Sequence, residues 1–151
     1  MVILIPVLLV LIPTIITCLI INSSIKKSEK EIKDKINKLA DNALKITPDE
    51  FFELKKSIKY DFEGVYILYN QTKDMYYVGQ SKTIFKRVNN HFTGHGNGDV
   101  YADYKYGSEF TIKMIALDKS GFNTLNELER NTIMTYSAYS KGYNKSRGNR
   151  G

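Results

Sequence analysis

Residues 64–80 read GVYILYNQTKDMYYVGQ, and this stretch constrains the fold more than any other part of the chain. GVYILYN and MYYVGQ are short, rich in β-branched and aromatic residues, and separated by the polar turn QTKD. Two such segments across a tight turn predict an antiparallel hairpin. Residues 109–117, EFTIKMIAL, alternate like a third strand. We therefore expect an α+β fold with a small three-stranded antiparallel sheet flanked by helices.

A helix is predicted directly after the hairpin. Thr83 has the side chain of an N-cap, and it precedes a segment with apolar residues on one side. Arg87 and His91 are four positions apart, so they project from one face of this helix, one turn from each other.

The rest of the globular part contains one loop and one further helix. Residues 93–99, TGHGNGD, are glycine-rich and predict a loop. Thr124 and Glu127 form a capping-box pattern, which predicts a helix that reaches about Tyr139. We place the globular domain at residues 60–151.

The first 21 residues carry no charged side chain. In a helix they would span roughly 30 Å, enough for a bilayer core. Lysines 26, 27, 30 and 33 follow, so the positive-inside rule places the later part of the chain in the cytoplasm. We expect residues 1–21 to be a transmembrane helix of a single-pass membrane protein. The alternative, a cleaved signal peptide, lacks a basic start and an A-x-A cleavage site.

Residues 22–59 are expected to form a charged helical stalk or linker, which ends in a second helix over 48–59 that TPDE (47–50) begins. Apolar residues recur at spacings of three, four and seven over residues 25–46, which indicates self-association through a heptad seam. These residues are Ile25, Ile32, Ile36, Leu39, Ala43 and Ile46. The alternative is a solvated stalk near anionic headgroups.

Charge favours a polyanionic partner. The net charge is +6, and residues 130–151 contain five Lys/Arg and no Asp/Glu. Cys18 is the one cysteine, which excludes a disulfide framework within one chain.

Residues 63–144 resemble a GIY-YIG nuclease domain. Gly64-Val65-Tyr66 resembles the first motif of that family, and Tyr77-Val78-Gly79 resembles the second. Arg87 stands eight residues after Gly79, where the family keeps an arginine, and His91 stands where members have His or Tyr.

Two further segments carry the resemblance. LNELERNTIM, residues 125–134, is similar to the helix that bears the metal-binding glutamate of the family, which places that role on Glu129. GYNKSRG, residues 142–148, is similar to the closing motif, whose asparagine matches Asn144. Some relatives have a lysine directly after the second triplet, where this chain has Gln80, and Lys82 is the candidate substitute.

The resemblance implies a DNA endonuclease that hydrolyses phosphodiester bonds with Mg²⁺ or Mn²⁺. A free tyrosine is a poor base at neutral pH, because its pKa is near 10. Close to Arg87 and a divalent cation, the phenolate of Tyr77 becomes accessible, and we expect Tyr77 to be the general base. The catalytic candidates are Tyr66, Tyr77, Arg87, His91 and Glu129, with Glu129 as the metal ligand.

DNA contacts are expected from four further residues, namely Asn144, Lys82, Lys145 and Arg147. His95, between glycines, is interpreted as a loop residue. Two alternatives compete with a nuclease tethered to the cytoplasmic face of a membrane. One is a catalytically silent, membrane-tethered DNA-binding module, and the other is a small membrane protein that assembles with protein partners.

Overall fold

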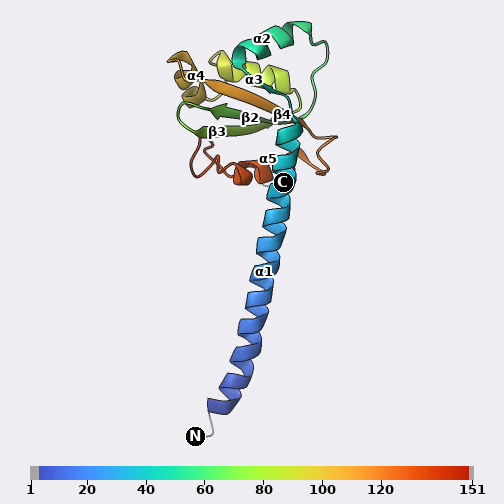
Figure 1. Cartoon of the computed structure of the whole chain (residues 1–151), viewed down its shortest axis with the longest axis vertical. Coiled ribbons are helices and arrows are strands. Elements are labelled where there is room, and N and C mark those ends of the chain that lie inside the picture. The colour runs from blue at the N-terminus through green and yellow to red at the C-terminus, as the bar shows by residue number, and fades with distance from the viewer. Residues whose placement is uncertain (1–3, 150–151) are drawn as a thin grey trace. The chain divides into compact units, whose positions relative to one another are not determined.

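The structure is a computed structural model that describes the backbone of residues 4–149 and the side chains of residues 13–149. It contains two compact units, residues 1–35 and residues 36–151. Along the chain the elements are α1 (Leu4–Asn42), β1 (Lys45–Ile46), α2 (Pro48–Ser57), β2 (Gly64–Asn70), β3 (Met75–Ser81), α3 (Ile84–Phe92), α4 (Gly98–Lys105), β4 (Phe110–Ala116) and α5 (Leu125–Thr135), as Figure 1 shows.

The sheet is antiparallel, with the strand order β1-β4-β2-β3. The three predicted strands and their hairpin are confirmed. The prediction of only three strands is wrong, because β1 pairs with the free edge of β4. A strand of two residues carries no periodic signal, so the heptad spacing alone predicted the place of Ile46. In this order β3 is the edge strand at one end of the sheet.

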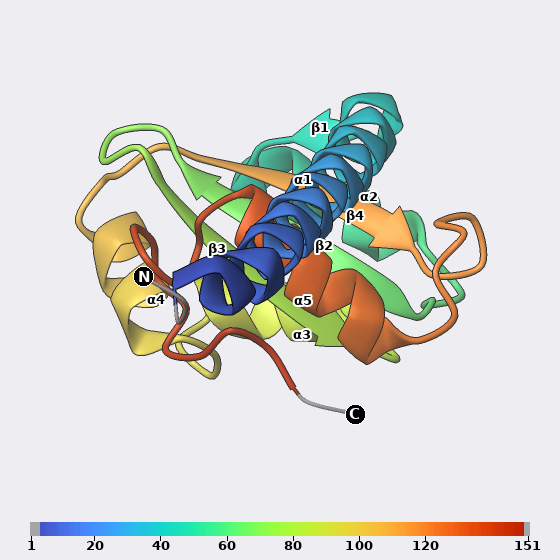
Figure 2. The same ribbon diagram turned by 90° about the horizontal axis from the view of Figure 1, so that it is seen from below.

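Helices cover both faces of the sheet: α2 and α3 lie on one face and α5 on the other (Figure 1 and Figure 2). Thr47 caps α2 as predicted, since its hydroxyl accepts a hydrogen bond from the Glu50 N–H and the Glu50 carboxylate accepts one from the Thr47 N–H. The fully buried Phe51 of α2 stacks on Phe85 of α3, with ring centroids 5.7 Å apart. This apolar contact fixes α3, which carries two of the candidate catalytic residues.

Two helix ends differ from the sequence-based predictions. Thr83 makes no capping hydrogen bond, and the Asp61 carboxylate instead accepts hydrogen bonds from the N–H groups of Phe85 (2.9 Å) and Lys86 (3.1 Å). Asp61 is distant in sequence from α3, so no local pattern predicted it. At α5 the Thr124 hydroxyl accepts from the Glu127 N–H as predicted, but the helix ends at Thr135.

The predicted loop at residues 93–99 is shorter than expected, because α4 begins at Gly98. Asn97 caps α4: its side-chain oxygen accepts hydrogen bonds from the N–H groups of Asp99 and Val100, each at 3.0 Å. The glycines around Asn97 indicate a loop, so its N-cap signal does not stand out in the sequence.

The N-terminal region is a continuous helix from Leu4 to Asn42, which joins the predicted membrane segment to the predicted stalk. Part of the membrane prediction falls outside the described residues, since residues 1–3 and the side chains before Pro13 are not described. Within the described part of the chain, no helix is apolar over a length sufficient to cross a membrane.

The predicted self-association seam over residues 25–46 does not form a continuous helical stripe. Ile36 and Ala40 are fully buried within the second unit, and Ile46 lies in β1 after the helix has ended. Of the predicted seam residues, Ile36 and Ile46 are instead part of the core of the domain itself, whereas the buried Ala40 lies outside the predicted seam.

Candidate active site

The two similar triplets place two tyrosines on one face of the hairpin. Tyr66 of β2 is opposite Gly79 of β3, and Tyr77 lies two residues from Gly79 on the same face. The two tyrosine rings have centroids 6.2 Å apart. A Cβ atom at Gly79 would overlap the Tyr66 hydroxyl. The glycine of the second triplet is therefore what lets Tyr66 reach across the edge strand.

His91, in the last turn of α3, is fully buried against both tyrosines. Its Nε2 is 2.9 Å from the Tyr66 hydroxyl oxygen, and its Nδ1 accepts a hydrogen bond from the Asn97 N–H at 2.9 Å. Because Nδ1 is an acceptor, the neutral ring carries its proton on Nε2 and donates to Tyr66. Burial, and next the charge of Arg87, lower the pKa of His91 from 6.5 to about 4. His91 is therefore neutral at physiological pH.

The loop before α4 fits closely around this histidine. A Cβ atom at Gly96 would come within 2.6 Å of His91 Nδ1, so a larger residue there would push the ring out of place. Asn97 fixes the tautomer of His91 through its backbone and begins α4 through its side chain. Sequence analysis missed this positioning role, although an Asn directly before a helix is an available N-cap signal.

Tyr66 and Tyr77 are not equivalent. Tyr66 is only 1% exposed, and burial followed by the charge of Tyr77 raises its pKa far above the ordinary value of 10. Tyr77 is partly exposed; burial raises its pKa too, but Arg87 and a hydrogen bond from Tyr66 both lower it. Tyr66, which accepts from His91, thus uses its own proton to support a negative charge on Tyr77.

Arg87 joins this group from the middle of α3. Its charge lowers the pKa of both Tyr66 and Tyr77, so the guanidinium lies beside both hydroxyls. The residue is nevertheless exposed, unlike His91 one turn later. A planar cation that is open to solvent at this place can bind a phosphate through two N–H groups.

Glu129 approaches from α5, which lies on the other face of the sheet. Its negative charge is near enough to Tyr77 to contribute to the raised pKa of that hydroxyl. Glu129 is 8% exposed, and its carboxylate accepts a hydrogen bond from Gln80 Nε2 at 3.0 Å. Burial raises the pKa of Glu129, while hydrogen bonds from Gln80 and the Asn149 backbone lower it.

Gln80 stands where some relatives have a lysine, and it has a role of its own. Its Nε2 donates to Asn126 at 2.6 Å as well as to Glu129, so it holds the carboxylate on α5 against β3. Lys82 is exposed after the end of β3. The positive charge that lowers the pKa of Tyr77 belongs to Arg87, and Lys82 is not among the groups that shift this pKa.

The side chain of Asn144 pairs with the backbone of the edge strand β3. Its side-chain oxygen accepts from the Val78 N–H at 2.9 Å, and its side-chain nitrogen donates to the Val78 carbonyl at 2.7 Å. The preceding Tyr143 N–H donates to the Tyr76 carbonyl, which continues the same pairing. Both ends of the Asn144 amide are therefore used to hold the strand beside Tyr77, which is a positioning role.

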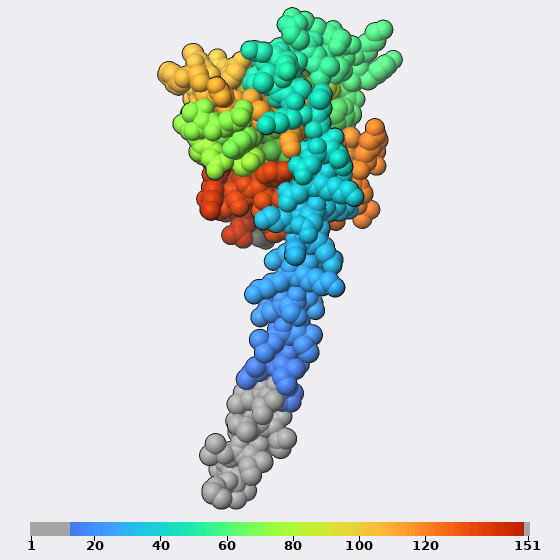
Figure 3. Space-filling view, viewed as in Figure 1, coloured from blue at the N-terminus to red at the C-terminus, as the bar shows by residue number. Residues whose placement is uncertain are grey.

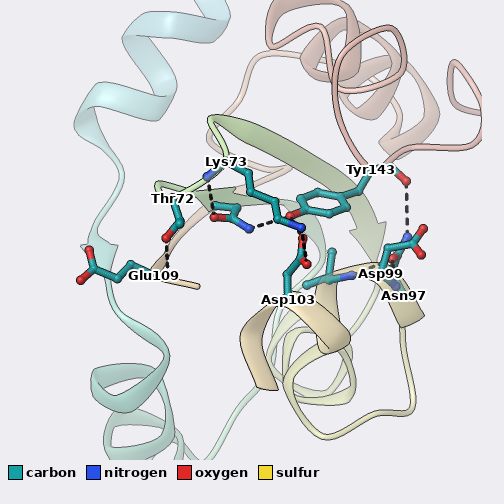
Figure 4. A network of polar contacts seen from close by, with 9 residues as sticks. Thr72, Lys73, Asn97, Asp99, Asp103, Glu109 and Tyr143 are labelled. Carbon is teal, nitrogen blue, oxygen red and sulfur yellow. Dashed lines mark hydrogen bonds and ion pairs between the residues drawn. The ribbon is translucent and has the colours of Figure 1, made fainter. Parts of the chain in front are cut away.

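A polar network anchors this closing segment (Figure 4). The Tyr143 hydroxyl donates to Asp103 at 2.6 Å and accepts from the buried Asn70 amide at 2.7 Å. Lys73 forms an ion pair with Asp103 at 2.6 Å, and Asn97 Nδ2 donates to the Tyr143 carbonyl at 3.4 Å. One network thus connects the loop that orients His91 with the segment that holds β3.

The remaining predicted residues lie outside the cluster of tyrosines. Lys145 forms an ion pair with Asp99 at 2.7 Å. The Arg147 guanidinium lies over the Tyr139 ring, 5.4 Å from its centroid. His95 is exposed, 3.3 Å from the Thr93 hydroxyl.

A divalent cation has one carboxylate to bind here. Among the described residues, no group of three or more His, Cys, Asp or Glu side chains is arranged as metal ligands. Glu129 supplies one hard oxygen donor at a site with hydroxyl groups. This donor set fits Mg²⁺ or Mn²⁺, since Mg²⁺ commonly takes one or two protein carboxylates and completes its shell with water and substrate phosphates.

A protein-family model and a solved structure are similar to this chain. Residues 62–144, more than half of the chain, match the family model of the GIY-YIG catalytic domain. Among solved structures, a mutant of the catalytic domain of intron endonuclease I-TevI is similar, with 23% identity and a TM-score of 0.44 over 59% of this chain and 98% of that one. No curated protein sequence matches. The chain therefore belongs to the GIY-YIG nuclease family, and it is a nuclease that hydrolyses phosphodiester bonds.

Proposed function

We propose that the chain is a metal-dependent DNA endonuclease in which Tyr77 is the general base. The observation that carries this proposal is the convergence on Tyr77 of two groups that favour its phenolate, the Arg87 guanidinium and the Tyr66 hydroxyl. Tyr77 is also the more exposed of the two tyrosines, so a water molecule and a phosphate can reach it.

In the proposed reaction, Tyr77 removes a proton from the water that attacks phosphorus, and the bond from phosphorus to the leaving oxygen breaks. Arg87 donates to the non-bridging oxygens as negative charge develops on them. Tyr66 donates to Tyr77 and is itself held by the Nε2 proton of His91. The histidine is thus a positioning residue, because its low pKa keeps it neutral.

Glu129 would hold the cation, with Gln80 fixing the orientation of its carboxylate. When bound, Mg²⁺ or Mn²⁺ would neutralise phosphate charge and favour ionisation of nearby oxygen groups. Such additional positive charge is needed here, because burial leaves the pKa of Tyr77 above its ordinary value despite Arg87.

The test is cleavage of supercoiled plasmid DNA by the purified full chain, with Mg²⁺, with Mn²⁺ and with excess chelator. We expect nicking or cutting with either metal and none with chelator. Glu129→Gln should abolish cleavage, whereas Glu127→Gln, two residues earlier in α5, should not. Undiminished cleavage in chelator would refute the mechanism. DNA binding without cleavage in any metal would favour the DNA-binding module.

Membrane tethering is a separate proposal, supported by the sequence alone. The support is the charge-free run over residues 1–21 and the lysines that follow it. A reporter fused after Gly151 should be cytoplasmic and sediment with membranes. A reporter that is exported, or that stays in the supernatant, would refute tethering without affecting the nuclease assignment.

A further inference from the structure

A hollow of about 360 Å³ is lined by α5 and the segment that follows it, and neither Tyr66 nor Tyr77 is among its lining residues. Arg130, Ile133 and Met134 of α5 line one side, and Tyr139 and Arg147 line the other. Its volume is within the range of about 300–1,000 Å³ that is typical of small-molecule sites. None of these five residues takes part in the catalytic cluster.

The hollow combines an apolar lining with two cations. Met134 is 48% exposed and Tyr139 is 44% exposed, which is high for side chains of this size. Arg147 lies over the Tyr139 ring. Within residues 13–149, neither Arg130 nor Arg147 forms an ion pair with a carboxylate, and residues 130–149 contain no acid. The chemistry therefore suits a ligand that is both flat and anionic.

The hollow adjoins the carboxylate side of the active site through neighbouring residues of α5 and the C-terminal segment. Arg130 directly follows Glu129 in α5, and Gly148 packs so closely that a Cβ atom there would lie 3.2 Å from Arg130 Cα. The Asn149 N–H then reaches the Glu129 carboxylate. In the space-filling view, α5 and the segment after it form one red region of the surface (Figure 3). A strand whose phosphate sits at Glu129 can therefore continue into the hollow.

We propose that the hollow is a nucleotide subsite, which takes one unstacked base of the DNA strand and the phosphate attached to it, next to the bond that is cut. The base contacts Met134 and stacks on Tyr139 in place of the Arg147 guanidinium, which turns to bind the phosphate together with Arg130. The identity of this ligand rests on the proposed function. Residues 36–149 contain no second DNA-binding module. The subsite gives this nuclease domain a means to prefer substrates whose bases can leave the stack.

The experiment uses the full chain with ¹³C-labelled methionine methyl groups and deoxyadenosine 5′-monophosphate as the probe. This nucleotide has no phosphodiester bond, so the nuclease cannot cleave it. We expect the Met134 methyl signal to shift on titration, while Met75 and Met114 stay in place. Met114 is the cross-strand partner of Tyr66, so it reports binding at the tyrosines instead. Deoxyadenosine and inorganic phosphate, each half of the ligand, should both bind more weakly.

Matched variants separate stacking from charge. Tyr139→Ala should weaken nucleotide binding by about tenfold, as loss of one base–aromatic stack commonly does. Tyr139→Phe should retain binding, and Tyr106→Ala, at a tyrosine that is 87% exposed after α4, should have no effect. Arg147→Gln should weaken binding more than Lys141→Gln, which removes the same charge outside the hollow.

Three outcomes would overturn the subsite: a Met134 signal that does not move, a Met114 signal that moves instead, or equal losses in the two charge variants. A Met134 shift with anionic phospholipid vesicles but not with the nucleotide would make the hollow a lipid site and would also overturn it. Plasmid cleavage, measured separately, distinguishes the two proposals. An active nuclease with an unresponsive Met134 refutes the subsite alone, and an inactive chain with a responsive Met134 refutes the nuclease mechanism alone.

Discussion

The active site has two sides that differ in how their polar groups are satisfied. On the buried side, Tyr66, His91 and Asn97 are hydrogen-bonded to one another. On the open side, Arg87 is exposed to solvent where a phosphate can approach, and Glu129, although buried, has its carboxylate held by Gln80 at β3. The residues of the buried side position the catalytic groups, and the residues of the open side act on the substrate. Changes on the open side should therefore reduce activity with little effect on stability, and changes on the buried side should affect both.

Apart from loss of the metal ligand Glu129, the largest effect is expected at Arg87. Arg87→Ala should lower the cleavage rate about 10³-fold, since a charge placed on a transferring phosphoryl group is commonly worth that much. The free energy of unfolding should change by less than about 0.5 kcal/mol, because the side chain is at the surface. Lys86→Ala, at the neighbouring exposed position, is the control. If Arg87→Ala lowered the stability but left the activity normal, Arg87 would be a structural residue and not a catalytic one.

On the buried side, His91 should make stability depend on pH. Its pKa is about 4 in the folded chain and 6.5 in the unfolded chain, so the unfolded chain binds more protons between these values. The free energy of unfolding should therefore fall by about 2 kcal/mol from this group between about pH 8 and about pH 5.

Urea unfolding at the two pH values measures this loss. His91→Gln should lack this part of the pH dependence, whatever its overall stability, whereas His95→Gln at the exposed loop position should keep it. Equal pH dependence in the wild type and His91→Gln would show that the histidine is not held in its neutral form.

Gln80 tests how the carboxylate is held. Gln80→Leu should raise the Mg²⁺ concentration needed for half-maximal cleavage by about 10- to 100-fold, as loss of a group that orients a metal ligand commonly does. The rate at saturating metal should recover, because Tyr77 and Arg87 remain in place. A metal requirement equal to that of the wild type would mean that the hydrogen bond from Gln80 to Glu129 does not matter for the cation.

The sequence indicated which side chains meet in the cluster, but not the contacts that position them. Tyr66, Tyr77, Arg87 and His91 follow from strand and helix periodicity together with family motifs, and the structure brings them together with Glu129. The Asn97 N–H donates to His91, and the Asp61 carboxylate accepts from the N–H groups of Phe85 and Lys86, contacts that form only in the folded chain. Such contacts leave no periodic trace in the sequence.

The same limit applies to the fold. The hairpin and the helix starts at Thr47 and Thr124 have local signals, and these predictions are confirmed. Strand β1 is stabilised by pairing with β4, which is more than sixty residues away in sequence. The spacing of apolar residues predicted Ile36 to be part of a helical seam, but Ile36 is buried in the core of the domain. An apolar stripe on a helix does not specify which surface covers it.

The smallest effect is expected from single charges in the C-terminal segment. Each lysine or arginine that contacts a DNA phosphate contributes about 0.9 to the slope of log affinity against log salt. Arg147→Gln should reduce the slope by about that amount, and Lys145→Gln by less, because Lys145 is already paired with Asp99. Equal slopes in both variants would place neither residue at a phosphate.

The most direct test of the division between the two sides is the single-turnover cleavage rate of Tyr77→Phe in Mg²⁺, with Tyr76→Phe as the matched control on the same strand. Tyr76 points to the other face and stacks on Tyr69 with ring centroids 4.4 Å apart, so its variant also loses one hydroxyl beside β2. We expect the rate of Tyr77→Phe to fall at least about 10²-fold, the lower end for loss of a general base, while Tyr76→Phe cuts like the wild type. A Tyr77→Phe enzyme that cuts as fast as Tyr76→Phe would contradict the assignment of Tyr77 as the base.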